Sequence, residues 1–194
     1  TDQYIQSSQK VGPSMADDIK NAAFLAVVFA MFCMAAYILL RFRDISFSVG
    51  AFASVAVTTL CIISFYTLLW KVLPFSMEVD QTFIAAILTI IGYSINDTVV
   101  VFDRIRETIG LYPKRDRYQV INDALNSTLS RTFNTSLTTL VVVLCIFILG
   151  GATIRSFTFA ILLGIIIGTY STLFVATPIA YELQKKKINK KAAA

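Results

Sequence analysis

Long apolar stretches separated by short polar connections fill most of this chain. Five of them approach the about 20 residues that a helix needs to cross the hydrocarbon core of a bilayer. They lack the alternation of apolar and polar residues typical of a membrane β-barrel strand. The pattern therefore predicts an all-α, polytopic membrane helix bundle with five transmembrane helices. The expected spans are 22–40, 47–70, 81–102, 132–149 and 157–181.

The polar segments divide the rest of the chain. We expect an external segment before the first helix (1–20), a transmembrane domain (21–182) and a basic cytoplasmic tail (183–194). The longest connection, 103–131, contains apolar residues at helical spacing over 118–129, which predicts an amphipathic helix feeding into the fourth span. That helix could lie in the membrane interface or form a solvated loop helix, and the sequence leaves both open.

Composition and charge agree with a membrane protein. Hydrophobic residues make up 56% of the chain, and the mean hydropathy is +0.70. The net charge of +5 could suggest a nucleic-acid partner, but 13 Lys and Arg residues fall on one side of the expected membrane and 4 on the other. This asymmetry predicts an external N-terminus and a cytoplasmic C-terminus. The basic residues thus indicate topology and contact with the lipid bilayer rather than with nucleic acid.

The sequence contains no motif typical of metal binding, cofactor binding or enzymatic catalysis. The chain has no His, and its three cysteines lie inside expected spans without CxxC spacing, as apolar filler does. No phosphate-binding loop and no nucleophile–base set is visible. We therefore expect no metal, no cofactor and no enzymatic activity. The cysteines are Cys33, Cys61 and Cys145.

One carboxylate lies well inside an apolar span. Placing a charged Asp at the centre of a membrane helix costs about 2.5–3.5 kcal/mol, so Asp97 is a functional candidate. A helical projection places it in a polar stripe, which is expected to face other helices or a wet pathway rather than lipid. The stripe consists of Thr89, Tyr93, Asn96, Asp97 and Arg104.

A second polar stripe follows the fourth span and contains Arg131. Because the third and fourth spans run antiparallel, Asp97 and Arg131 are expected at comparable depth, as a pair across neighbouring helices. Burial favours a neutral carboxyl group and a nearby guanidinium favours an ionised one, so such a pair suits a proton site. A static buried ion pair or an interhelical hydrogen bond is the alternative. The stripe contains Thr128, Arg131, Thr135 and Thr138.

Small residues recur every four positions along the last span. This spacing allows the backbone of another helix to approach closely, without naming the partner. Gly164 and Gly168 are the candidates for helix packing within the series Ala160, Gly164, Gly168, Thr172 and Ala176.

Several motifs together resemble a known family. The stretch 92–107 reads GYSINDTVVVFDRIRE, 11–13 reads VGP, 130–132 reads SRT and 135–139 reads TSLTT. Over about 11–182 the chain resembles SecF, the export accessory subunit, or the SecF half of fused SecDF proteins. The resemblance implies a membrane fold related to resistance-nodulation-division (RND) exporters. It also implies that the proton motive force is used to promote protein export by the Sec translocase across the bacterial plasma membrane.

The resemblance also implies roles for residues. In the family, a transmembrane Asp and an Arg on the following helix are tied to proton use, and they correspond here to Asp97 and Arg131. The remaining polar candidates are expected to orient this pair or bound water. They are Tyr93, Asn96, Thr98 and Thr135.

Partners and missing parts follow from the same resemblance. SecD, separate or fused, the SecYEG translocon and, indirectly, an unfolded exported polypeptide are the expected partners. SecF has six helices and a periplasmic domain, and this chain opens without Met, so we expect it to be part of a longer polypeptide without the first helix and that domain. A purely structural scaffold of the translocon and an RND-like antiporter of small molecules and protons are the alternative functions.

Overall fold

The computed structural model describes residues 13–70, 72, 77 and 80–192. In these residues the chain is helical and contains no strand, and five helices are long and apolar enough to cross a membrane. The expectation of an all-α bundle with five spans is confirmed. The elements are α1 (Pro13–Phe42), α2 (Ile45–Leu69), α3 (Gln81–Leu111), α4 (Arg117–Leu149), α5 (Ala152–Ser171), η2 (Thr172–Ala176) and α6 (Thr177–Ala192).

An aspartate caps the start of each of three helices. Asp44 Oδ1 accepts a hydrogen bond from Ser46 N at 3.1 Å ahead of α2, and Asp80 Oδ1 accepts one from Phe83 N at 2.9 Å ahead of α3. Asp116 does the same for α4 with Gln119 N, at 3.4 Å. A side-chain cap satisfies a backbone N–H group that has no partner within the helix, and contributes about 1 kcal/mol. These caps set where α2, α3 and α4 begin.

Helices extend beyond the expected spans at several boundaries. The helix α1 begins at Pro13, inside the segment expected to precede it, and residues 1–12, including Val11 and Gly12, lie outside the described residues. The helix α3 continues to Leu111 because nothing breaks it before Pro113, which disfavours the helical conformation in the residue preceding it. The expected loop 103–131 thereby shrinks to the turn 112–116, and the expected amphipathic helix is the first part of α4.

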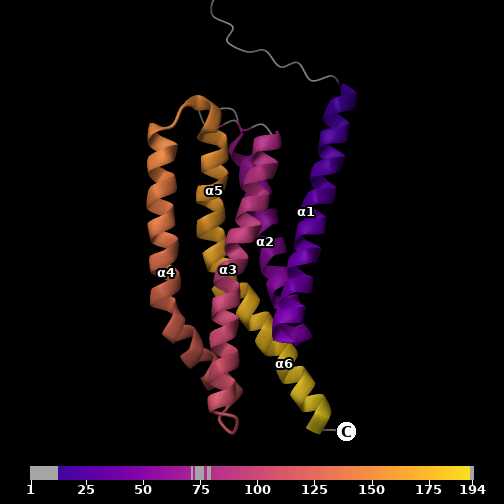
Figure 1. Ribbon diagram of the computed structural model, residues 1–194, viewed down its shortest axis with the longest axis vertical. Helices are drawn as coiled ribbons and strands as arrows, with labels where there is room; N and C mark the ends of the chain where they lie inside the picture. Colours follow the sequence, from indigo (N-terminus) through magenta and orange to yellow (C-terminus); the bar gives the residue numbers. More distant parts are fainter. Residues whose placement is uncertain (1–12, 71, 73–76, 78–79, 193–194) are drawn as a thin grey trace, which may run out of the picture.

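The last span is a bent rod made of α5, η2 and α6. Thr177 Oγ1 donates to Thr172 O, five residues earlier, at 3.2 Å, and Pro178 next to it has no N–H to donate. A π-helical turn beside a proline is a recognised cause of a kink. Consequently α6 leaves the direction of α5 (Figure 1) and carries the basic tail as helix up to Ala192.

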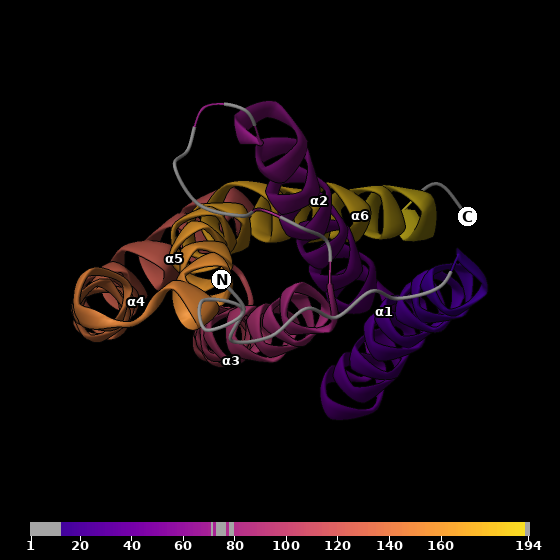
Figure 2. The ribbon, with the colours of Figure 1, turned by 90° about the horizontal axis from the view of Figure 1, so that it is seen from above.

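The helix α3 lies between α4 and α5 on one side and α1 on the other (Figures 1 and 2). The end of the bundle where α1 and α3 end and α2 and α4 begin is here called the basic end. At that end α1 packs through Ile38 and Phe42, which are buried, and Phe42, Phe47 and Phe102 form an aromatic cluster. Farther away α1 diverges, and Phe24 is 73% exposed, as suits a side chain in contact with lipid.

The helices α3 and α5 run parallel in a fixed register. A Cβ atom added to Gly164 would collide with Ile90, and one added to Gly168 would lie 3.2 Å from Ser94 Oγ. Thr98 and Thr172 share a hydrogen bond of 2.9 Å. In each of the three contacts the residue on α3 and the residue on the last span are 74 positions apart in the sequence. Gly164, Gly168 and Thr172 of the last span therefore face α3, whereas Ala176 packs against Gly50 on α2.

Candidate functional site

Asp97 lies in the middle of α3 and points into the bundle. Its side chain is only 6% exposed, and Ser136 Oγ on α4 donates a hydrogen bond to Asp97 Oδ2 at 3.4 Å. Ser136 is buried as well. The charged residue of the third span is thus placed between helices and away from lipid, in a setting where a carboxyl group can exist only with polar neighbours.

Polar contacts between α3 and α4 form an antiparallel ladder around Asp97. Towards the end of the bundle opposite the basic end, Tyr93 Oη donates a hydrogen bond to Thr139 Oγ1 at 3.3 Å. Towards the basic end, Arg104 Nε donates to Ser127 Oγ at 3.0 Å. In this register the residue across from Asp97 is Ser136, and Arg131 lies five residues from Ser136. Five residues correspond to about 1.4 helical turns, or about 7.5 Å along the axis, towards the basic end.

Arg131 is exposed and does not touch Asp97 directly. Within the part of the chain that the structure describes, its side chain forms neither a hydrogen bond nor an ion pair, and it lines a cavity between α3 and α4. The two residues of the expected pair are therefore not in direct contact in this structure. The physical reason is the register of the ladder, which brings Ser136 rather than Arg131 opposite Asp97.

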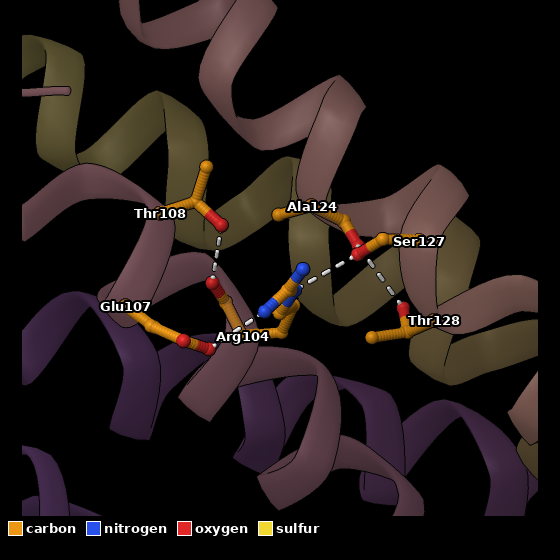
Figure 3. A network of polar contacts seen from close by, with 6 residues as sticks. All are labelled: Arg104, Glu107, Thr108, Ala124, Ser127 and Thr128. Carbon is orange, nitrogen blue, oxygen red and sulfur yellow. Dashed lines mark hydrogen bonds and ion pairs between the residues drawn. The ribbon is translucent and has the colours of Figure 1, made fainter. Parts of the chain in front are cut away.

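A polar cavity of about 320 Å³ lies beside Arg131, between α3 and α4. Figure 3 shows part of its wall: Arg104 extends from α3 to Ser127 on α4, and its Nη1 forms an ion pair of 2.9 Å with Glu107. The cavity runs from Val100, less than one turn from Asp97, towards the basic end. Charged groups and room for water thus approach Asp97 from that side. The lining residues are Val100, Asp103, Arg104, Glu107, Ser127, Thr128 and Arg131.

A chain of hydroxyl groups continues from Asp97 into α5. Ser136 Oγ lies 2.7 Å from Thr169 Oγ1, and Thr169 Oγ1 donates to the carbonyl oxygen of Ile165 at 2.8 Å. Neither Ser136 nor Thr169 was selected from the sequence. The run 135–139 is rich in hydroxyl groups, but only the rotation of α4 decides which of them faces α3.

The other candidate side chains lie on different faces. Thr98 is fully buried on the α5 side, where it bonds to Thr172, and Asn96 is exposed. Thr135 donates to the Arg131 carbonyl oxygen of its own helix at 2.9 Å. Of the four supporting residues, only Tyr93 therefore makes a hydrogen bond to α4 beside Asp97.

One buried hydroxyl group near the site lacks a partner. Ser94 is 2% exposed, and within the described residues its Oγ forms no hydrogen bond. It lies on α3 against Gly168, one turn from Asp97. No group of His, Cys, Asp and Glu side chains that could hold a metal ion occurs among the described residues.

Comparison with known proteins places this chain in a family. The family described as "Protein export membrane protein SecD/SecF, C-terminal" matches residues 1–186, nearly the whole chain. The chain belongs to the SecD/SecF family. The resemblance to SecF is thereby confirmed, and with it a multi-pass protein of the bacterial inner membrane.

Curated SecD/SecF relatives are close in sequence. The chain is 48% identical to protein translocase subunit SecF of Rhodothermus marinus over 176 residues, which cover 91% of this chain and 57% of the relative. It is 41% identical to the subunit of the same name from Vibrio alginolyticus over 179 residues, covering 91% of this chain and 54% of the relative. The chain thus spans little more than half the length of these relatives.

A solved SecDF structure has the same fold. The crystal structure of SecDF in the super-membrane-facing form matches with a TM-score of 0.81 and 35% identity. The match covers 96% of this chain and 24% of that one. The bundle described here therefore corresponds to one part of the larger SecDF architecture.

Proposed function

We propose that this chain is the membrane part of a SecF-type accessory subunit of the Sec protein translocase, which uses the proton motive force to promote protein export. The observation that supports it most directly is the buried Asp97, held among hydroxyl groups and next to a charged cavity. The proposed orientation has the basic end in the cytoplasm, because that end carries most of the Lys and Arg residues.

Asp97 is the proposed proton carrier, and the hydroxyl chain suits both of its states. When Asp97 is ionised, Ser136 donates to it and Thr169 donates to Ser136. When Asp97 carries a proton, it donates to Ser136, Ser136 donates to Thr169, and Thr169 donates to the Ile165 carbonyl oxygen. Reversal of the Ser136 and Thr169 hydroxyl groups thus keeps both of them hydrogen-bonded whether or not Asp97 carries the proton.

Arg131 is the proposed regulator of that proton. In the structure it lines the cavity and does not touch Asp97. Movement towards Asp97 would favour the ionised carboxylate and release of the proton, whereas retreat would favour uptake. A proton that moves inwards through this cycle releases about 2.3 kcal/mol per 100 mV of membrane potential.

The proposed partners are SecD, separate or fused, and the SecYEG translocon, with the exported polypeptide contacted indirectly. Asn96 supports a further helix beside α3, because it is exposed in the middle of a membrane-spanning helix. A polar side chain at that depth is costly to leave in lipid and is satisfied by a neighbouring helix or a wet pathway. The subunit itself is proposed to be non-enzymatic.

Asp97→Asn in the full-length protein, reconstituted with SecD and the translocon, tests the proposal. The amide cannot take part in the proton cycle, so proton-dependent export should fall to the level measured without a membrane potential. Asp123→Asn is the matched control, because Asp123 is half exposed on α4 and pairs with Arg115. Normal proton-dependent export with Asp97→Asn and intact assembly would favour a structural scaffold instead. Proton flux that requires a small-molecule substrate would favour an antiporter.

A further inference from the structure

A second cavity lies at the basic end and has not entered the proposed mechanism. Its volume is about 330 Å³, and it lies where the α1–α2 turn, the end of α3, the start of α4 and the helix α6 meet. Four of its lining side chains are cationic, and one is acidic. The cations are Arg43, Arg106, Arg117 and Lys187, and the acid is Asp44.

The positive charges of this cavity are mostly unpaired. Lys187 forms the ion pair with Asp44, at 3.4 Å. Arg106 Nη1 donates a long hydrogen bond, 3.5 Å, to the carbonyl oxygen of Arg41, which does not neutralise its charge. Among the residues that the structure describes, Arg43 and Arg117 form no ion pair. Three cations therefore remain around one cavity, which creates a strong preference for an anion.

The remainder of the lining is apolar. Phe42 and Phe47 are buried with 4% exposure each, and they continue the aromatic cluster of the bundle core. Ile109 and Ile188 add aliphatic surface from α3 and α6. A ligand that fills the cavity must therefore present an anionic group to the arginines and apolar atoms to the other side. A free phosphate ion offers only the first of these.

The position of the cavity indicates where such a ligand comes from. The ends of the spanning helices surround it, and α6 leaves the bundle obliquely beside it (Figure 1). Helix ends lie at the depth of lipid headgroups, and basic pockets between membrane helices bind anionic headgroups.

We propose that the cavity binds one anionic phospholipid from the leaflet at the basic end. Its phosphate lies among Arg43, Arg106 and Arg117, and its glycerol and first acyl carbons lie against the apolar lining. The bound lipid joins α6 to the α1–α2 turn, which in the described structure are linked by the exposed pair of Lys187 and Asp44.

Native mass spectrometry of the full-length protein in detergent tests this assignment, with phosphatidylglycerol and phosphatidylcholine as the added lipids. The unmodified protein should retain one phosphatidylglycerol more tightly than phosphatidylcholine. Each juxtamembrane cation changes affinity by about fivefold, so Arg106→Gln with Arg117→Gln should weaken phosphatidylglycerol binding by more than about tenfold. The control, Lys185→Gln with Lys186→Gln, removes the same charge from α6 outside the lining and should bind as the unmodified protein does.

Further variants keep the result interpretable if the neutralised protein misfolds. Arg106→Lys with Arg117→Lys retains the charge and should retain binding. Gln184→Glu adds a negative charge to the lining and should weaken binding by about fivefold. Equal retention of both lipids, or equal loss in the Arg106/Arg117 and Lys185/Lys186 neutralised variants, would overturn the site. Displacement of the lipid by millimolar glycerol 3-phosphate would assign the cavity to a soluble phosphate ester instead.

Discussion

Asp97 on α3 accepts its hydrogen bond from Ser136 on α4, whereas Arg131 lies five residues nearer the basic end. This relationship makes a hydroxyl group, rather than a guanidinium, the immediate neighbour of the buried carboxyl group. A neutral hydroxyl can donate to an ionised carboxylate and accept from a protonated one. The site is therefore built to tolerate a change of charge, as a proton carrier requires.

The first prediction concerns Ser136→Ala in the full-length, reconstituted protein. Loss of the hydroxyl removes the donor to Asp97 and interrupts the chain to Thr169, so proton-dependent export should fall by about tenfold, which corresponds to one hydrogen bond to a charged group. Export rates with and without a membrane potential measure the effect. Ser130→Ala, on an exposed position of the same helix, should leave the rates unchanged. Equal rates in the two variants would remove Ser136 from the proton site.

The second prediction concerns the hydrogen bond between Thr98 and Thr172. Thr98→Val leaves the buried Thr172 hydroxyl without its partner on α3, which should cost about 1–3 kcal/mol of stability. Replacing both residues by Val should cost less than the sum of the single changes, because no unsatisfied group remains. Thermal unfolding in detergent measures the four proteins of the cycle. Additive losses would show that the two hydroxyl groups do not interact.

The third prediction concerns close packing between α3 and α5. Gly164→Ala places a methyl group against Ile90, so it should destabilise the protein by about 1–3 kcal/mol. Gly92→Ala is the matched control, because a Cβ atom there meets nothing within 4 Å. Ala is the better helix former, so this control should be neutral or stabilising by up to about 1 kcal/mol. Ile90→Val combined with Gly164→Ala should recover part of the loss, and equal melting temperatures for the two Ala variants would contradict the register.

The sequence predicted the type of fold because its signals are local. Each span is a predominantly apolar stretch of sufficient length to cross a membrane. The N-caps Asp44, Asp80 and Asp116, by contrast, were identified only in the structure. The helix ends were harder to predict from the sequence, because a helix can continue past its apolar stretch until a helix-breaking residue such as Pro113 ends it. The bend before α6 depends on a π-helical turn, for which a single proline is a weak signal.

The candidate site was only partly predictable for a geometric reason. The cost of a charge in lipid singles out Asp97 without any knowledge of its neighbours. Its partner depends on the relative rotation and vertical register of α3 and α4, which no local pattern fixes. Arg131 and Ser136 are five residues apart on α4, and the register of the two helices brings Ser136 opposite Asp97. Thr98 follows Asp97 at about 100° around α3, which directs it to Thr172 of the last span rather than to α4.

The last prediction concerns Ser94, whose buried hydroxyl forms no hydrogen bond among the described residues. Burial of an unpaired hydroxyl is unfavourable, so Ser94→Ala should leave stability unchanged or raise it by about 1 kcal/mol. Ser54→Ala is the informative control, because Ser54 Oγ donates to Ser171 Oγ at 3.0 Å in an equally buried place. That change should cost about 1 kcal/mol. Thermal unfolding of the two variants decides the matter: a loss of stability in Ser94→Ala as large as that in Ser54→Ala would show that Ser94 has a partner, such as a water molecule between α3 and α5.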